Sequence, residues 1–172
     1  MTGQINVNKI AARTGTAITV ESGHVITQPG SVIQTVTTGT ISSTTFSSTG
    51  SWTNTNYTLS ITPQFSNSKI LFHSNHNFRL VGSTPIRGGI RIQRTISATD
   101  TVLWNSANHT ETFQVRNADN EHDTLGSVMF LDSPATTSSV TYLLQAYLLT
   151  GTNFYVFESA RGGGIVLQEI AQ

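Results

Sequence analysis

Apolar and polar residues alternate along several short segments of the chain, with the period of two that is typical of β-strands. Residues 69–81 show this pattern most clearly. Apolar side chains on one face of this segment are Ile70, Phe72, Phe78 and Leu80, with Ser74 and His76 between them. Lys69, His73, Asn75, Asn77 and Arg79 take most of the other face. Because successive side chains of a strand point to opposite faces of a sheet, we expect one buried and one wet face.

Further segments carry the same signal, separated by clusters of Ser, Thr, Gly and Asn that favour turns. The pattern predicts strands at residues 31–38, 57–62, 90–93, 101–104, 112–115, 125–131, 139–149, 154–157 and 165–170. Residues 40–55 read as a loop with an edge strand. About eight strands and no convincing helix predict an all-β fold, a jelly-roll-like antiparallel β-sandwich over residues 31–172.

Residues 140–149 are apolar on both faces, which favours a central strand or one that faces a subunit interface. The next apolar segment, residues 154–157, follows within a few residues. We therefore expect a hairpin through Thr150–Asn153 between these two strands.

The N-terminal part of the chain has a different character. Its alternating segments are very short, at residues 4–8, 17–20 and 24–27, and Pro29-Gly30 then breaks the pattern. Strands this short do not make a stable core alone. Residues 1–30 are therefore predicted to form an extended arm that docks on another chain or on a neighbouring copy.

Composition limits the functions that the chain can have. Only 10% of its residues are charged, the net charge is zero and the pI is about 7, so no field steers it toward nucleic acid or an anionic membrane. The loose group Arg87, Arg91 and Arg94 does not change this. The absence of Cys excludes disulfides, thiolate metal sites and cysteine nucleophiles. A start without the pattern of a signal peptide fits release by lysis.

Catalytic motifs with recognisable spacing are not found. His73 and His76 are three residues apart on a strand, so they point to opposite faces and do not chelate one ion together. We expect an exposed His73 and a core or interface His76. His24, His109 and His122 are isolated, and a ring of one histidine per copy on a threefold axis remains the metal-binding alternative.

Three other features have a binding interpretation and a structural one. Residues 117–123 are rich in oxygen ligands but lack the spacing of a calcium loop, so a solvated loop is favoured. Gly162–Gly164 is favoured as a flexible turn over an anion cradle. Aromatic candidates for stacking on a sugar, each favoured as a core or subunit contact, are Trp52, Tyr57, Trp104, Tyr147, Tyr155 and Phe157. No catalytic, cofactor-binding or metal residue is assigned.

An ordered series of short motifs spans nearly the whole chain. It runs through residues 5–12, 15–20, 22–24, 31–36, 61–63, 67–71, 91–94, 131–137 and 167–171. The stretch Leu131-Asp-Ser-Pro before a Thr/Ser-rich turn and a Val-Thr-Tyr strand is the most telling. In these motifs the chain resembles short virion structural and tail-fibre-like proteins of marine and cyanobacterial tailed bacteriophages. The resemblance implies a trimeric jelly roll, similar to tumour-necrosis-factor-like trimers, and no catalytic residues.

The expected function is a non-enzymatic bacteriophage virion protein: a trimeric tail-fibre or tail-tip module in host attachment, assembled in the host cytoplasm and released by lysis. Its arm would dock on other virion proteins, and loops 82–86 and 105–123 would meet a host glycan or receptor. The alternative is a capsid decoration protein that stabilises the phage head. A carbohydrate-active enzyme is disfavoured, because Asp119, Glu121 and Asp123 share one loop instead of flanking a cleft. Neither nucleic acid nor membrane insertion is expected.

Overall fold

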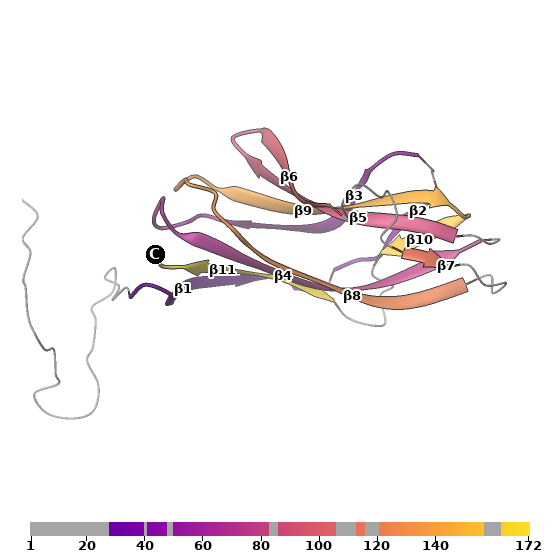
Figure 1. Cartoon of the computed structure of the whole chain (residues 1–172), viewed down its shortest axis with the longest axis horizontal. Helices are drawn as coiled ribbons and strands as arrows, with labels where there is room; N and C mark the ends of the chain where they lie inside the picture. Colours follow the sequence, from indigo (N-terminus) through magenta and orange to yellow (C-terminus); the bar gives the residue numbers. More distant parts are fainter. Residues whose placement is uncertain are drawn as a thin grey trace, which may run out of the picture.

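The computed structural model describes residues 28–39, 41–47, 50–82, 86–105, 113–115, 121–156 and 163–172. Within these residues the chain forms eleven β-strands, no helix, and hence no helix with the length and apolar character of a membrane span. The strands form two antiparallel sheets, A and B, that pack face to face as a sandwich (Figure 1). The predicted all-β sandwich is confirmed. Residues 1–27 of the predicted arm lie outside the described residues.

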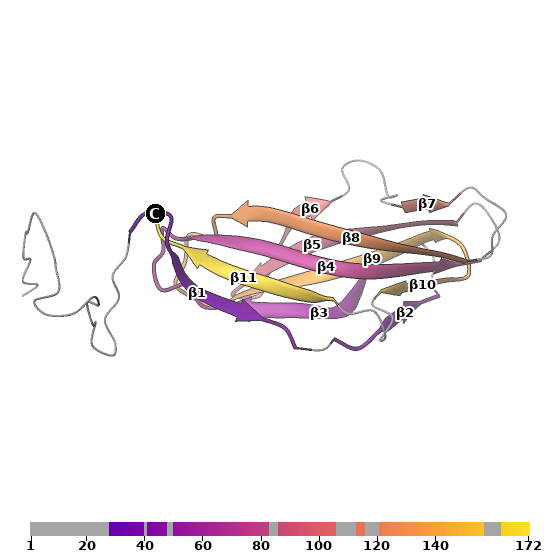
Figure 2. The same ribbon diagram turned by 90° about the horizontal axis from the view of Figure 1, so that it is seen from below.

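Sheet A is built around its longest strand, β4. Its strands are β1 (Val32–Thr37), β2 (Thr44–Phe46), β4 (Lys69–Val81), β8 (Glu121–Asp132), β10 (Asn153–Val156) and β11 (Gly164–Ile170). On one side β4 pairs with β8 along nearly its whole length. On the other side it pairs first with β11 and then with β10, which continue to β1 and β2 (Figure 2). Among the described residues β8 is therefore an edge of sheet A.

Sheet B contains β3 (Thr53–Ile61), β5 (Ile86–Ile96), β6 (Thr99–Asn105), β7 (Phe113–Val115) and β9 (Val140–Thr150). The long strands follow the order β3-β9-β5-β6, and β7 also pairs with β5. In sheet A the corresponding order is β1-β11-β4-β8. Strands that are consecutive in sequence thus alternate largely between the two sheets, as in a jelly roll.

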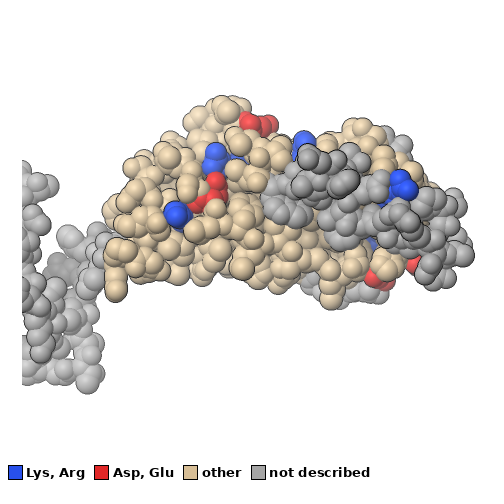
Figure 3. All heavy atoms as spheres, in the orientation of Figure 1, with Lys and Arg blue, Asp and Glu red and all other residues tan. Residues whose placement is uncertain are grey.

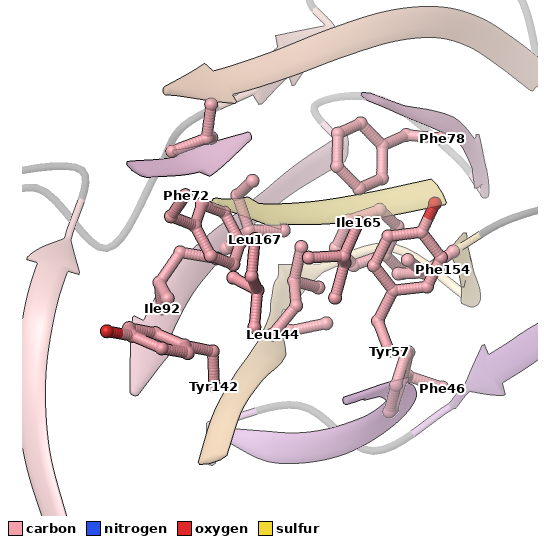
Figure 4. Close-up of a cluster of buried hydrophobic side chains, with 14 of the residues drawn as sticks. Phe46, Tyr57, Phe72, Phe78, Ile92, Tyr142, Leu144, Phe154, Ile165 and Leu167 are labelled. Carbon is pink, nitrogen blue, oxygen red and sulfur yellow. The ribbon is translucent and has the colours of Figure 1, made fainter. Parts of the chain in front are cut away.

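The core fills the space between the sheets. On β4 every second side chain is buried, from Ile70 to Leu80, as the alternation predicts. Figure 4 shows aromatic rings of both sheets meeting in this layer. Phe72 lies 5.8 Å from Tyr142 of sheet B, and Phe78 lies 5.5 Å from Phe154, between ring centroids. Burial of these rings and of the aliphatic side chains around them stabilises the sandwich.

The hairpin predicted through Thr150–Asn153 is wrong. β9 belongs to sheet B and β10 to sheet A, where β10 pairs with β4 and β2, so this connection crosses between the layers. The connection after β4 also crosses, and the two pack together: the Thr152 amide donates to the Val81 carbonyl at 2.8 Å. Gly82 has φ +149°, and a Cβ there would lie 2.6 Å from the Thr152 nitrogen.

The polar loop predicted at residues 117–123 is also wrong in part. Glu121–Asp123 begin β8, where Glu121 pairs with Val81 and Asp123 with Arg79. Arg79 and Glu121 form an ion pair across the two strands. Residues 117–120 lie outside the described residues. Because residues 121–123 are all polar or charged, the local sequence predicts a loop. They form a strand because they pair with β4.

Gly126 of β8 offers a test of the fold. A Cβ at this position would lie 2.7 Å from the ring of His76 and 2.8 Å from the ring of Phe78, both buried. Because these rings are fixed in the core, we expect Gly126→Ala to lower the free energy of unfolding by about 1–3 kcal/mol. Gly39→Ala, where the new methyl group meets nothing within 4 Å, serves as the control and should change it by less than about 0.5 kcal/mol. Equal denaturant midpoints for the two variants would contradict the packing at Gly126.

A candidate assembly surface on the outer face of sheet A

The outer face of sheet A is the side turned away from sheet B, and Figure 2 looks onto it. Strand alternation decides which residues point there: those on β4 and β11 whose neighbours in sequence are buried in the core. Apolar residues on this face, which we call the outer patch, are Val32, Leu71, Leu125, Met129, Leu131, Val166 and Ile170. They come from four strands that are far apart in sequence.

Strand register brings these residues into neighbouring rows. Leu71 is paired with Leu131 of β8 and Gln168 of β11. One row further on, His73 lies between Met129 and Val166. Cross-strand neighbours of this kind have Cβ atoms about 4.5–5.5 Å apart, so their side chains touch. The two rows bring Leu71, Leu131, Met129 and Val166 together, interrupted by His73 and Gln168, while Leu125 lies beyond Ser127 on β8.

The β8 side of the outer patch is more exposed than an ordinary sheet face. Leu125 is 79%, Met129 68% and Leu131 51% exposed. Of six large hydrophobic residues that are exposed in the described part of the chain, four belong to the outer patch. A group of exposed apolar side chains of this kind on one face of a folded protein indicates an interaction site.

Charged residues lie at the ends of this face and not in its middle. Lys69 lies at one end of β4, while Arg79, Glu121 and Asp123 lie at the other. On the described outward positions between them, the polar groups are uncharged or histidine. Figure 3, which views the molecule from another side, shows that charged side chains are also sparse there. A partner would thus cover the outer patch without removing many charges from water.

Two hollows adjoin the outer patch where β4 changes partner from β11 to β10. Asn75 pairs with Gly164 and Phe78 with Val156, so neither β10 nor β11 pairs with His76 or Asn77. Leu125 lines both hollows, which measure about 590 and 600 Å³. Asn77 lines the second, is 2% exposed, and its amide oxygen has no hydrogen-bond partner among the described residues. A partner molecule could supply the missing donor.

The sequence pointed to β9 as the strand with two apolar faces, and the structure decides between the two alternatives for that pattern. β9 is a central strand of sheet B, one of the two predicted alternatives. Two of its outward residues are covered within the chain: Tyr147 packs on Trp52 at 5.3 Å, and Gln145 accepts a hydrogen bond from Arg91 at 2.6 Å. The strand with exposed apolar residues on its outer face is β8. In the sequence, this exposed face of β8 corresponds to apolar residues at alternate positions from Leu125 to Leu131, with Ser127 among them.

Acidic groups in the described residues are mostly occupied with structural contacts. Asp132 accepts hydrogen bonds from Arg94 at 2.7 Å and from Tyr142 at 2.8 Å, and so ties β8 to sheet B. Burial, and then the bond to Asp132, raise the pKa of Tyr142 above its usual range. Glu121 and Asp123, two of the carboxylates weighed for an enzyme, are exposed on β8. Asp119 lies outside the described residues.

Glu169 closes the end of the sandwich where the chain begins and ends. It is fully buried and accepts hydrogen bonds from the Gln64 amide at 2.8 Å and from the Gln34 side chain at 2.6 Å. Burial raises the pKa of Glu169, but these hydrogen bonds outweigh burial and leave the pKa below its ordinary value. Glu169 therefore fastens the loop after β3 to β1 and β11.

The aromatic and arginine candidates are accounted for by contacts inside the chain. Tyr57 is fully buried and donates to the Asn75 carbonyl at 2.8 Å. Trp52 lies between Tyr147 and the Arg91 guanidinium, which sits 4.7 Å from its ring centroid. The Arg79 guanidinium lies over the ring of Tyr155, and Arg94 forms an ion pair with Asp132. Arg87 and Arg91 point outward and Arg94 inward, so the three arginines form no single patch. The side chain of Trp104 and the whole of Phe157 lie outside the described residues.

The histidines separate as predicted. His76 is buried in the core, whereas His73 lies on the outer face and bonds to Ser127 at 3.3 Å. His122 is exposed on β8, and His24 and His109 lie outside the described residues. The structure brings no three His, Asp or Glu side chains together as a metal site in the part of the chain that it describes. Gly163 and Gly164 line the first hollow, and Gly162 is not described.

Comparison with known proteins adds little to this geometry. No family model matches the chain, and no curated protein matches it. Among solved structures, a chain from the structure of infectious bursal disease virus Gx strain is similar, with a TM-score of 0.45 and 12% identity. The match covers 90% of this chain and 40% of the viral chain.

His76 gives a prediction for stability as a function of pH. Burial lowers its pKa from 6.5 to about 4. Between pH 6.5 and about pH 4, His76 is therefore protonated in the unfolded chain and neutral in the folded chain. Above pH 6.5 the protonation of His76 does not affect the free energy of unfolding. As the pH drops from 6.5 to 4, this free energy falls by about 3 kcal/mol. In denaturant titrations between pH 6.5 and 4, the free energy of unfolding should fall less steeply with pH for His76→Gln than for the control His73→Gln. Equal slopes of this free energy against pH for the two variants would contradict the prediction.

Proposed function

We propose that this protein is a non-enzymatic structural component of a bacteriophage particle, and that it works by assembly. The outer patch carries this proposal, because its exposed leucine and methionine side chains lie on one face that has no charge in its middle. The described carboxylates and arginines support it further, since most are engaged in contacts that hold the sandwich together. The motifs shared with phage virion proteins point in the same direction.

Copies of the chain associate as a homotrimer through the outer patch. An isologous contact, in which the same surface meets itself, closes as a dimer, whereas a ring of three needs two different surfaces. Here the exposed apolar edge formed by Leu125, Met129 and Leu131 supplies one surface. The half-buried part of the outer patch on β4 and β11 supplies the other. The edge of each copy then packs on the face of the next.

The molecule has two functionally different ends. Gln28, where the described chain begins, lies with the C-terminus at one end of the sandwich, since Gly30 donates to the Ala171 carbonyl at 2.9 Å (Figure 1). β4 ends at Val81 and β8 begins at Glu121 at the opposite end of the sandwich (Figure 2). The arm thus anchors the trimer on other virion proteins, while the far end presents its loops to a host glycan or receptor.

This arrangement suits a tail-fibre or tail-tip module. The alternative is a capsid decoration protein, in which the arm clamps capsid subunits and the same trimer stabilises the phage head. Both functions use the outer patch and the arm, and both place the protein in the virion. They differ in copy number and in whether the far end must meet the host.

Copy number in purified particles, measured against the major capsid protein, separates these functions. A tail module should be present at a small fraction of the capsid protein, and added free trimer should block adsorption to host cells. A copy number close to that of the capsid protein would identify a decoration protein. Absence from purified particles would overturn the virion proposal.

The trimer has its own test in the outer patch. Met129→Asp places a charge on an exposed side chain, so the fold should survive while the interface must bury an unpaired carboxylate. We expect at least a tenfold loss of association, measured by light scattering at micromolar concentration. Val102→Asp, at another exposed hydrophobic residue on β6 of sheet B, should leave the trimer intact. A wild-type monomer, or a trimer of the Met129→Asp variant, would contradict the proposed interface.

A further inference from the structure

β8 differs from every other edge strand in the described part of the chain. It pairs with β4 through twelve consecutive residue pairs without a register shift. Edges formed by β1, β3 and β6 each carry a bulge or irregularity in their pairing. The remaining short strands β2 and β7 are three residues long. Bulges and short length are the usual means by which proteins prevent edge strands from pairing with other chains.

The sequence of β8 protects only the ends of the strand, where Glu121, Asp123 and Asp132 carry charge. From Thr124 to Leu131 it contains no charged residue and no proline. Its single inward-pointing charge, Asp132, is neutralised by Arg94. This regular, uncharged stretch of eight residues, about 27 Å long, exposes a row of amides and carbonyls that have no strand partner in the described part of the chain and that another extended chain can use. Such an edge is expected to be covered when the protein is in its working state.

The N-terminal segment of the chain is a suitable strand to cover it. Residues 17–27 contain two of the short alternating segments, Ala17–Val20 and His24–Thr27, and span about 36 Å when extended, close to the length of β8. The chain enters the sandwich at the end where β8 finishes, because Glu169, which pairs with Gln34 of β1, and Asp132 both pair with Ile70. Gln28, which directly follows the segment in sequence, therefore lies at the end of the sandwich where β8 finishes.

A neighbouring copy, and not the same copy, offers the accessible β8. Within one chain, β1 and β8 lie at opposite edges of sheet A, separated by β11 and β4. A segment that returned to its own β8 would have to cross the outer patch, which the proposed trimer covers. In that trimer the β8 edge of each copy packs on the face of the next, beside the strand from which the next copy's arm departs.

We propose that residues 17–27 of each copy add as a strand to the β8 edge of a neighbouring copy, so that sheet A continues from one subunit into the next. This inference rests on the proposed trimer. Backbone hydrogen bonds would then lock the ring, and the apolar side chains of the added segment would extend the outer patch. Residues before this segment stay available for docking on other virion proteins.

Cysteine cross-linking tests the pairing, because the native chain contains no cysteine. Ser127→Cys in β8 is combined with one cysteine at each position from 17 to 27 in turn, in full-length protein. Under mild oxidation we expect covalent dimers and trimers on a denaturing gel, at every second arm position, since alternate residues of a strand face the same side. Disulfides that form only within one chain would show that the arm covers its own β8 and would overturn the proposal.

Hydrogen exchange provides an independent test. In a lone sandwich, about half of the β8 amides point away from β4 and exchange quickly; in the paired edge they are protected. Ile18→Pro combined with Thr19→Pro removes two successive amides, one of which must face β8. We expect alternate β8 amides to exchange at least tenfold faster in this variant and not in the control Thr14→Pro. A trimer whose alternate β8 amides exchange quickly in the native protein, with no interchain disulfide, would overturn the added strand but leave the proposed function standing.

Discussion

Two packed sheets have four faces, and the packing of sheet A on sheet B covers only two of them. The two outer faces remain, and they differ in how far the chain itself covers them. On sheet B part of the outer face is covered within the chain, where Trp52, Arg91 and Gln145 form a connected layer over β9 and β5, while Val102 of β6 is exposed. On sheet A the outer face keeps leucine, methionine and valine side chains in contact with water. That difference, and not any arrangement of reactive groups, distinguishes one side of the molecule from the other.

Polar interactions support this division by holding the margins of the sandwich. Asp132 joins the end of β8 to sheet B through Arg94 and Tyr142, which fixes the edge strand in place. Glu169 fastens the loop after β3 to the strands beside the chain termini. An edge strand that is rigidly positioned and apolar is well suited to recognition, because little conformational entropy is lost when a partner binds it.

Much of the fold could be predicted from the sequence because local alternation is strong where one face of a strand is buried. The strand at residues 69–81 was predicted with its bounds and its buried face correct. Local signals failed where the topology decided the outcome. Thr150–Asn153 has the composition of a hairpin turn, yet Gly82 and Gly151 allow two connections to cross together between the sheets. Glu121–Asp123 are polar like a loop, and only pairing with β4 makes them a strand.

The candidate surface was harder to predict, because a strand with two apolar faces can be either central in a sheet or exposed on one side. Residues 140–149 and 125–131 share this pattern, and nothing in the sequence shows which strand lies at an edge. The structure separates them, since β9 has a partner on both sides and β8 has a partner on one. Where sheet order is unknown, apolar periodicity identifies the strand but not what covers it.

Oxidation of Met129 by dilute hydrogen peroxide tests most directly whether another copy covers the outer patch. In the single sandwich this side chain is 68% exposed and should form the sulfoxide at close to the rate of free methionine. The account requires that Met129 in the native protein, at concentrations where copies associate, be oxidised several times more slowly, and that dilution restore the fast rate. Oxidation as fast as that of free methionine at every concentration would show that the outer patch stays open to water, and would contradict the account.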